Sequence, residues 1–209
     1  FPNHEIINWG VSSYGTLHSL LQIENNLNEN TPKMIVLAYG KFHQMRNVFS
    51  RQRRRQVMAW GDLGCMNQPY ATLDSEGRLI VQKSDKLIHT LWKGADKSRV
   101  IYYGQALIEN FLDLFDNRKA ITEQIILKIK AICEQENIQF VLANIEGVGS
   151  ESIKKFCIQN EITFIDISTG VYKKELTNYP YDDHPNAKGH KEFAKKLIPF
   201  LREFLREEN

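Results

Sequence analysis

The sequence predicts an α/β fold, a three-layer sandwich in which helices cover both faces of a mainly parallel sheet. Short apolar runs and amphipathic stretches alternate along most of the chain, the pattern that gives parallel strands joined by helical crossovers. The run at residues 34–39 (MIVLAY) is continuously apolar, which is typical of a strand buried on both faces of a sheet. One short β-pattern in the middle of the chain interrupts this alternation and indicates an inserted β-hairpin.

The N-terminal part of the pattern begins with an expected strand at residues 5–9 (EIINW). Leucines near helical spacing predict a helix at residues 16–27. The apolar strand at residues 34–39 follows and ends at Gly40. A strongly basic helix is then expected over residues 43–60.

The expected hairpin pairs residues 70–73 with residues 78–82 around a turn that contains Gly77. It is too short to have a core of its own. We therefore expect residues 69–83 to be an insertion in a single domain that spans residues 1–209.

The remaining part of the chain returns to alternating strands and helices. Pro199 should kink or divide the last helix, because proline removes a helical hydrogen bond. In such folds a ligand site lies beyond the carboxyl ends of the strands, so the loops there are the informative ones. The expected elements are helices at residues 103–115, 121–136, 150–159 and 186–206 and strands at residues 140–143 and 162–167.

Composition restricts the class of protein. The 209 residues are 42% hydrophobic and 25% charged, as in an ordinary globular domain. The formal net charge of +2 gives no support for a nucleic-acid partner, and no apolar run has the length of a membrane span. Cys133 and Cys157 fall in expected helices and are interpreted as buried thiols, and Cys65 has no partner at metal-ligand spacing. Oligomeric state and localisation are not determined by these features.

The densest group of chemically active side chains is YDDHPNAKGH, at residues 181–190. An imidazole such as that of His184 is the usual general base for a serine hydroxyl, because its pKa lies near neutral pH. A carboxylate on the other ring nitrogen orients the imidazole and stabilises its charged form. Residues two apart in an extended loop point the same way, which favours Asp182 over Asp183 as this carboxylate. The structural alternative is a polar turn that caps the last helix, with Asn186 as the cap.

The order Asp-x-His-Pro-Asn-x-x-Gly-His before a C-terminal helix resembles the last motif block of the SGNH/GDSL hydrolases, a family with a flavodoxin-like sheet. Many members have the aspartate three residues before the histidine, where this chain has Tyr181. The chain therefore resembles the members with the shorter spacing. The choice between Asp182 and Asp183 stays open at this point.

Residues 8–16 (NWGVSSYGT) are similar to the second block of that family, in which a backbone N–H contributes to the oxyanion hole. By this register the donor falls on Ser13, whose role needs no side chain. In the third block the family usually has an asparagine, and here Phe42 stands in its place without a donor. His43, as a pocket-lining residue, or the nearby Asn47 could substitute, although neither is in register.

The family's first block, which carries the nucleophilic serine on a central strand, is absent from this chain. None of the candidate serines matches its position, and Gly61-Asp62-Leu63 has the wrong third residue. Without that strand a sheet of this type would have unpaired edges at its centre. We therefore expect the natural polypeptide to be longer at its N-terminus. The candidate serines are Ser12, Ser13, Ser150 and Ser168.

The resemblance implies a serine esterase or acyl hydrolase in which His184 is the base and Asp182 orients it. It implies no metal and no organic cofactor, and its substrate would be a small-molecule or carbohydrate ester, such as an O-acyl group. Two alternatives follow from the same residues. One is a non-catalytic relative that binds carbohydrate or a protein partner, which Phe42 and the missing serine favour, and the other is an acyltransferase that uses the same triad.

Overall fold

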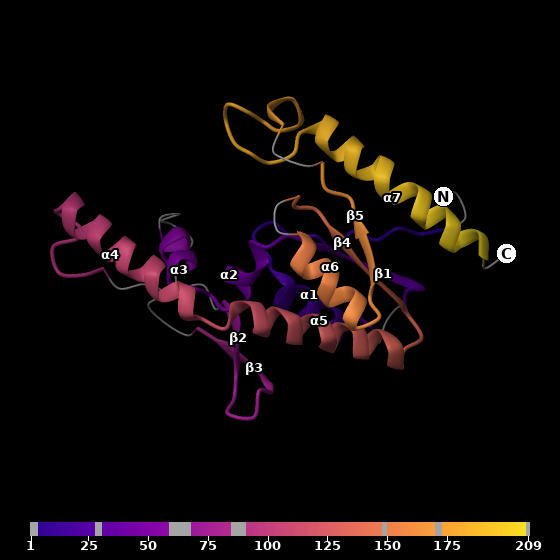
Figure 1. The fold of residues 1–209 in the computed structure, drawn as a ribbon, viewed down its shortest axis with the longest axis horizontal. Helices are drawn as coiled ribbons and strands as arrows, with labels where there is room; N and C mark the ends of the chain where they lie inside the picture. Colours follow the sequence, from indigo (N-terminus) through magenta and orange to yellow (C-terminus); the bar gives the residue numbers. More distant parts are fainter. Residues whose placement is uncertain are drawn as a thin grey trace. The chain divides into compact units, whose positions relative to one another are not determined.

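The computed structural model describes residues 4–27, 31–58, 68–84, 91–147, 150–169 and 173–207 (Figure 1). The chain forms two compact units. The first comprises Phe1–Asn30 and Phe42–Ile129, and the second comprises Thr31–Lys41 and Lys130–Asn209. The described residues form a mixed α/β structure, as the sequence predicts.

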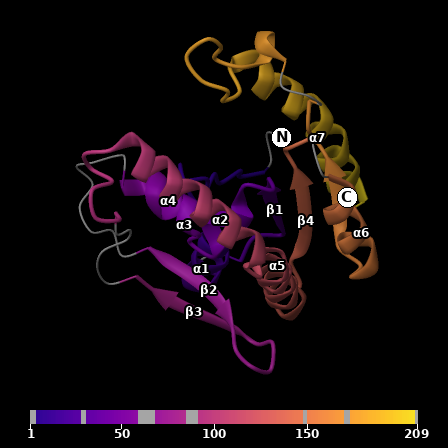
Figure 2. The ribbon, with the colours of Figure 1, turned by 60° about the vertical axis from the view of Figure 1, so that its left-hand side comes forward.

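The second unit is built on a three-stranded parallel sheet. Its strands are β1 (Met34–Tyr39), β4 (Gln139–Asn144) and β5 (Thr163–Asp166), in the order β1-β4-β5. Val141 pairs with Val36 on one side and with Thr163 on the other. Figure 2 shows β1 and β4 side by side. The three apolar runs therefore form parallel strands, and the central strand β4 is buried from Phe140 onward.

Helices of the second unit follow the predicted positions. α6 (Ser150–Gln159) packs beside β5 and buries Ile153 and Cys157. The one-turn helix η2 (Lys174–Leu176) precedes α7 (Ala187–Glu207). Of the two predicted effects of Pro199, division of the helix is excluded, because α7 runs through it as one helix, and a kink stays a prediction. Proline removes only one helical hydrogen bond, and the apolar side chains of α7 keep helical spacing on both sides of it.

The first unit is mainly helical. Its core is formed by apolar residues of α1 and α5, and α5 continues beyond Ile129 into the second unit. The fully buried side chains include Leu17, Leu20, Ile125 and Ile126. The helices are α1 (Thr16–Asn26), α2 (His43–Asn47), α3 (Arg51–Met58), α4 (Arg99–Leu112), η1 (Asp113–Phe115) and α5 (Arg118–Gln135).

The predicted basic helix is two helices, α2 and α3, and the prediction of a single helix is wrong. Phe49 ends the first of them in the left-handed region, at φ 49°. Ser50 then accepts the backbone N–H of Arg53 on its hydroxyl, as an N-cap does. Buried Asp113 accepts the backbone N–H groups of Arg51 and Gln52, which completes the cap from a distant part of the chain.

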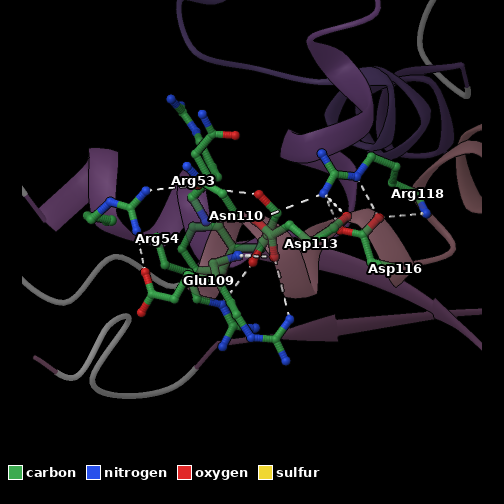
Figure 3. A network of polar contacts seen from close by, with 12 residues as sticks. Arg53, Arg54, Glu109, Asn110, Asp113, Asp116 and Arg118 are labelled. Atoms are coloured by element: carbon green, nitrogen blue, oxygen red, sulfur yellow. Dashed lines mark hydrogen bonds and ion pairs between the residues drawn. The ribbon is translucent and has the colours of Figure 1, made fainter. Parts of the chain in front are cut away.

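Figure 3 shows the polar network around Asp113. The guanidinium of Arg118, in α5, lies 3.9 Å from the Asp113 carboxylate and 2.5 Å from that of Asp116. In the same network Arg55 of α3 forms an ion pair with Glu109 of α4. Glu109 and Asn110, which bind Arg55, lie on the side of α4 that faces α3, whereas large apolar side chains of α4 such as Leu107 are exposed.

The hairpin is confirmed. β2 (Pro69–Leu73) pairs antiparallel with β3 (Leu79–Lys83) in a separate two-stranded sheet of the first unit. Gly77 occupies the turn at φ 77°, where glycine is favoured, and Asp74 accepts the N–H groups of the turn. Within the described strands, neither β2 nor β3 pairs with the parallel sheet.

Two further sequence predictions are wrong, one of a strand near the N-terminus and one of the first residue of a helix. Residues 5–9 form no strand, because among the described residues no neighbouring strand pairs with them, and most of their side chains are exposed. α4 begins at Arg99, before the predicted residue 103, because the Ser98 hydroxyl accepts the N–H of Ile101. No described helix combines the length and apolar character needed to cross a membrane.

Candidate functional site

The loop before α7 brings His184 and Asp182 together. Nδ1 of His184 lies 3.2 Å from Oδ1 of Asp182, the contact that the sequence predicted. The imidazole is 84% exposed, so Nε2 is not enclosed by its own loop. Within the described residues the His184 side chain forms no hydrogen bond to a hydroxyl or thiol. The loop therefore brings an imidazole and a carboxylate together without a hydroxyl or thiol in contact with them among the described residues.

The contact between His184 and Asp182 is produced by a local turn and not by the extended loop that the sequence analysis assumed. The same Oδ1 of Asp182 accepts the backbone N–H of His184 at 2.8 Å, an Asx turn that folds the carboxylate back onto the residue two positions ahead. Asn178 donates a further hydrogen bond to it at 3.3 Å. The backbone N–H of His184 lowers the pKa of Asp182, so the carboxylate is ionised at neutral pH. Asp183 is exposed and makes no hydrogen bond within the described residues.

Asn186 fixes the loop to the start of α7 and to η2 with the residue that follows it. Its Oδ1 accepts the N–H groups of Lys188 and Gly189, which is the capping role predicted from the sequence. Its Nδ2 donates to the carbonyls of Thr177, at 2.7 Å, and Glu175, at 3.1 Å. One asparagine thus holds three backbone segments around His184.

Gly189 is required where the loop packs on η2. A Cβ at this position would lie 2.4 Å from the carbonyl oxygen of Leu176 and 3.1 Å from Cβ of Pro185. The Leu176 oxygen belongs to the backbone, so a Cβ at residue 189 could be accommodated only if the chain itself shifted. The Gly of the motif is therefore explained by close backbone approach.

In the first unit, residues 11–14 form a tight turn directly before α1. Tyr14 donates its N–H to the carbonyl of Val11 at 3.2 Å, and Ser13 has φ 70°. A positive φ at the third position is typical of a type II turn and favours glycine. Ser13 is therefore a non-glycine residue in a conformation that favours glycine.

The backbone N–H of Ser13 donates to no acceptor within the described residues, whereas those of Tyr14, Gly15 and Leu17 each donate to one. Gly15 donates to Nδ1 of His18, and Leu17 donates to Oδ1 of Asn47. A backbone donor that is left unpaired beside a helix N-terminus suits the stabilisation of a developing negative charge.

His43 lies in the interior of the first unit. It is 9% exposed, and its Nδ1 is 3.3 Å from the hydroxyl of buried Thr16. Burial, and then the charges of Arg46 and His18, lower the pKa of His43 to about 3. The imidazole is therefore neutral and packs against Thr16, the first residue of α1.

Asn47, the other substitute donor considered from the sequence, has both ends of its amide engaged. Its Oδ1 accepts the N–H of Leu17, and its Nδ2 donates to the hydroxyl of Thr122 at 2.8 Å. The side chain is fully buried. Asn47 caps α1 from a distance, and its buried amide is not accessible to a ligand.

Two arginines that the sequence analysis did not select lie against the Ser13 turn. Arg46 donates to the carbonyl of Tyr14 at 2.7 Å, and Arg53 approaches the carbonyl of Ser13 at 3.5 Å. The Arg46 guanidinium also lies over the ring of Phe42, 4.5 Å from its centroid. The only sequence signal for them is the basic character of this segment, which does not indicate the turn that they contact.

Beyond the carboxyl ends of β4 and β5, the second unit has a polar cluster of which the sequence analysis named only Ser168, as a candidate serine. Asn144 donates to Asp166 at 3.1 Å, and Ser168 donates its backbone N–H to the same carboxylate at 3.0 Å. Burial opposes ionisation of Asp166, but these hydrogen bonds outweigh it and lower its pKa. Ser168 is 4% exposed, and Lys196 donates to its carbonyl. The cluster stabilises the loop and presents no exposed nucleophile.

A cavity of about 330 Å³ in the first unit lies between α3, η1 and the hairpin. Its lining includes Phe49, Arg54, Tyr70 and Asp113, and no residue of the Ser13 turn. Among the residues described, no group of histidine, cysteine and carboxylate side chains is arranged to hold a metal ion. Gly61-Asp62-Leu63 and Cys65 lie outside the described residues.

Ser13 and His43 belong to the first unit and His184 to the second. That they line one pocket stays a prediction. Comparisons with models of known protein families, with curated proteins and with solved structures found no match to this chain.

Proposed function

We propose that this chain carries the His-Asp part of a serine ester hydrolase of the SGNH type. The observation that carries the proposal is the 3.2 Å contact between Nδ1 of His184 and Asp182, within the Asp-x-His-Pro-Asn-x-x-Gly-His order. An ionised carboxylate on Nδ1 holds the imidazole in the tautomer that leaves Nε2 as a proton acceptor.

The proposed reaction needs a nucleophilic serine, which the sequence analysis expects upstream of this chain. Its Oγ would form a bond to the ester carbonyl carbon while its proton passes to Nε2 of His184. The carbonyl π electrons move to the oxygen, which becomes an oxyanion near the N–H of Ser13. Collapse of this intermediate expels the alcohol, which takes the proton from His184, and water then releases the acyl group by the same steps.

The test is ester hydrolysis by the full-length natural polypeptide and three variants, using short-chain nitrophenyl esters and O-acetylated carbohydrate. His184→Ala should lower turnover by at least ~10³-fold, as loss of a triad base generally does. Asp182→Asn should cost less, because the imidazole remains. Asp183→Asn is the matched control and should retain wild-type turnover, because Asp183 makes no contact in the loop.

Wild-type activity in His184→Ala would contradict the catalytic proposal. A larger loss in Asp183→Asn than in Asp182→Asn would contradict only the choice of carboxylate. Circular dichroism and thermal unfolding of each variant separate a loss of chemistry from a loss of folding.

One observation favours a second function, that of a non-catalytic module that binds carbohydrate. Phe42 has no hydrogen-bond donor, and Asn47 and His43 are both occupied in the interior. An oxyanion hole reduced to a single backbone N–H would be weak. Carbohydrate binding measured by calorimetry, without turnover of any ester, would support this second function.

A further inference from the structure

The weakest part of the proposed hydrolase is the side-chain donor of its oxyanion hole. Phe42 occupies the expected position and cannot donate. Asn47 has both amide ends bonded inside the unit, and His43 is buried against Thr16. If the site is catalytic, another side chain close to the Ser13 turn must supply the donor.

Two arginines contact this turn, and Arg46 makes a shorter contact with it than Arg53 does. Its Nη1 donates to the carbonyl of Tyr14, the residue next to Ser13, at 2.7 Å. Its guanidinium lies over the Phe42 ring, 4.5 Å from the centroid, so the phenylalanine that replaces the expected asparagine supports the guanidinium plane. Guanidinium has five N–H donors, and the Tyr14 carbonyl uses one of them.

The charge of Arg46 is not neutralised by its surroundings. Within the described residues it forms no ion pair with a carboxylate, although it is half-buried. Burial, and then repulsion from Arg53, lower its pKa to about 10, so it remains charged at neutral pH. A half-buried cation without a counter-ion is stabilised by an anion that forms beside it.

We propose that Arg46 is the side-chain donor of the oxyanion hole and acts together with the backbone N–H of Ser13. The inference rests on the proposed ester hydrolase. Arg46 would donate an N–H to the oxygen of the tetrahedral intermediate while the Phe42 ring and the Tyr14 carbonyl hold its position. The charge on the guanidinium is most useful in the transition state, when the oxygen carries negative charge, and less so with the neutral ester.

The experiment uses the full-length natural polypeptide and measures kcat and KM separately on a short-chain nitrophenyl ester. Arg46→Ala should lower kcat by about 10²–10³-fold with little change in KM, as loss of one oxyanion donor does. Ethylguanidinium added to Arg46→Ala should restore kcat with a saturable dependence, because it returns the missing group to the space left by the side chain. Arg46→Lys should retain more activity than Arg46→Ala, since it keeps a charged donor.

Arg54→Ala is the matched control. Arg54 also lies over a phenylalanine ring, that of Phe49, and donates to a backbone carbonyl of the same unit, but it does not contact the Ser13 turn. The kcat of the Arg54→Ala variant should stay near that of the wild type and should not change when ethylguanidinium is added. Thermal unfolding of both variants shows whether removal of the arginine has altered the fold.

A kcat of Arg46→Ala within threefold of the wild type would overturn the inference. So would a large loss in a folded Arg46→Ala variant that ethylguanidinium does not recover, because it would indicate a purely structural contact with Tyr14. In both cases the hydrolase proposal survives, since the wild type is active. A wild type that hydrolyses no ester overturns the hydrolase, and the role of Arg46 with it.

Discussion

His43 shows how burial sets the protonation state of a single side chain. Its imidazole is 9% exposed, contacts the Thr16 hydroxyl and lies near the charges of Arg46 and His18. Burial disfavours the charged imidazolium, and the neighbouring positive charges add to this effect. His43 is therefore neutral in the folded protein over the whole range in which an ordinary histidine titrates.

This makes the stability of the first unit pH-dependent. The pKa of His43 is lowered from 6.5 to about 3, so between these values the unfolded chain binds one proton more than the folded chain. The contribution is fully present above pH 6.5 and is lost as the pH falls toward 3. Moving from pH 7.5 to pH 5 should cost about 2 kcal/mol of unfolding free energy from this group.

Urea unfolding at the two pH values measures this cost. His43→Asn, which keeps a polar side chain without a titrating ring, should be less stable at pH 7.5 but should show a smaller loss at pH 5. Buried His18, whose pKa is lowered in the same direction, would leave part of the loss. Equal pH dependence in wild type and His43→Asn would contradict the assignment.

At the scale of an element, the His184 loop is defined by how it packs on its own unit. Asn186 caps α7 and binds the carbonyls of Glu175, within η2, and Thr177, directly after it, and Gly189 allows α7 to approach Leu176. The contact of His184 with Asp182 thus depends on a scaffold of backbone contacts. Changes that alter this scaffold should affect activity without touching either side chain.

Gly189→Ala tests this dependence. The new Cβ would lie 2.4 Å from the Leu176 carbonyl oxygen, so the loop must move. We expect a loss of about 1–3 kcal/mol in unfolding free energy and at least a tenfold loss of ester hydrolysis in the full-length protein. Chemical denaturation and initial rates measure the two effects.

Gly104→Ala is the control for Gly189→Ala. Gly104 lies within α4, and a Cβ there meets no atom within 4 Å. Because alanine is the better helix former, this change should stabilise the protein by about 0.5–1 kcal/mol and leave hydrolysis unchanged. If both substitutions had the same effect, close approach to Leu176 would not be the reason for the glycine.

At the scale of the whole molecule, the candidate residues are divided between two units. Ser13 and Arg46 belong to the first and His184 to the second, so a working site requires the units to meet at these residues. In the parallel sheet, β1 has a strand neighbour on one side only among the described strands. The expected upstream strand that carries the serine would have a place on that free edge, which stays a prediction.

Distance measurement between spin labels tests whether the two loops meet. Labels at Ser12→Cys and Asp183→Cys, both exposed positions next to the proposed groups, should give a short and narrow distance distribution in the full-length protein. Burial raises the pKa of Cys133 to about 11 and that of Cys157 to about 12, so these thiols should stay unlabelled, and Cys65 is replaced by serine. A long or broad distribution would contradict a shared pocket.

The sequence alone determined the features that depend on neighbouring residues. The three apolar runs became parallel strands, the glycine turn became a hairpin, α6 has its predicted bounds, and Asp182 contacts His184 through a turn of three residues. Periodicity, turn chemistry and short side-chain to backbone hydrogen bonds act over a few residues, so their signal is present in the linear pattern.

Only the tertiary structure decided which distant residues meet. Asp113 caps α3 from about sixty positions away, and this contact, with Phe49, divides the predicted basic helix. Residues 5–9 have strand-forming side chains but no partner strand in the described chain. Arg46 donates a hydrogen bond to Tyr14, and the side-chain amide of Asn47 forms hydrogen bonds with Leu17 of α1 and with Thr122. Contacts between residues far apart in the sequence depend on packing and burial. The spacing of neighbouring residues carries no information about them.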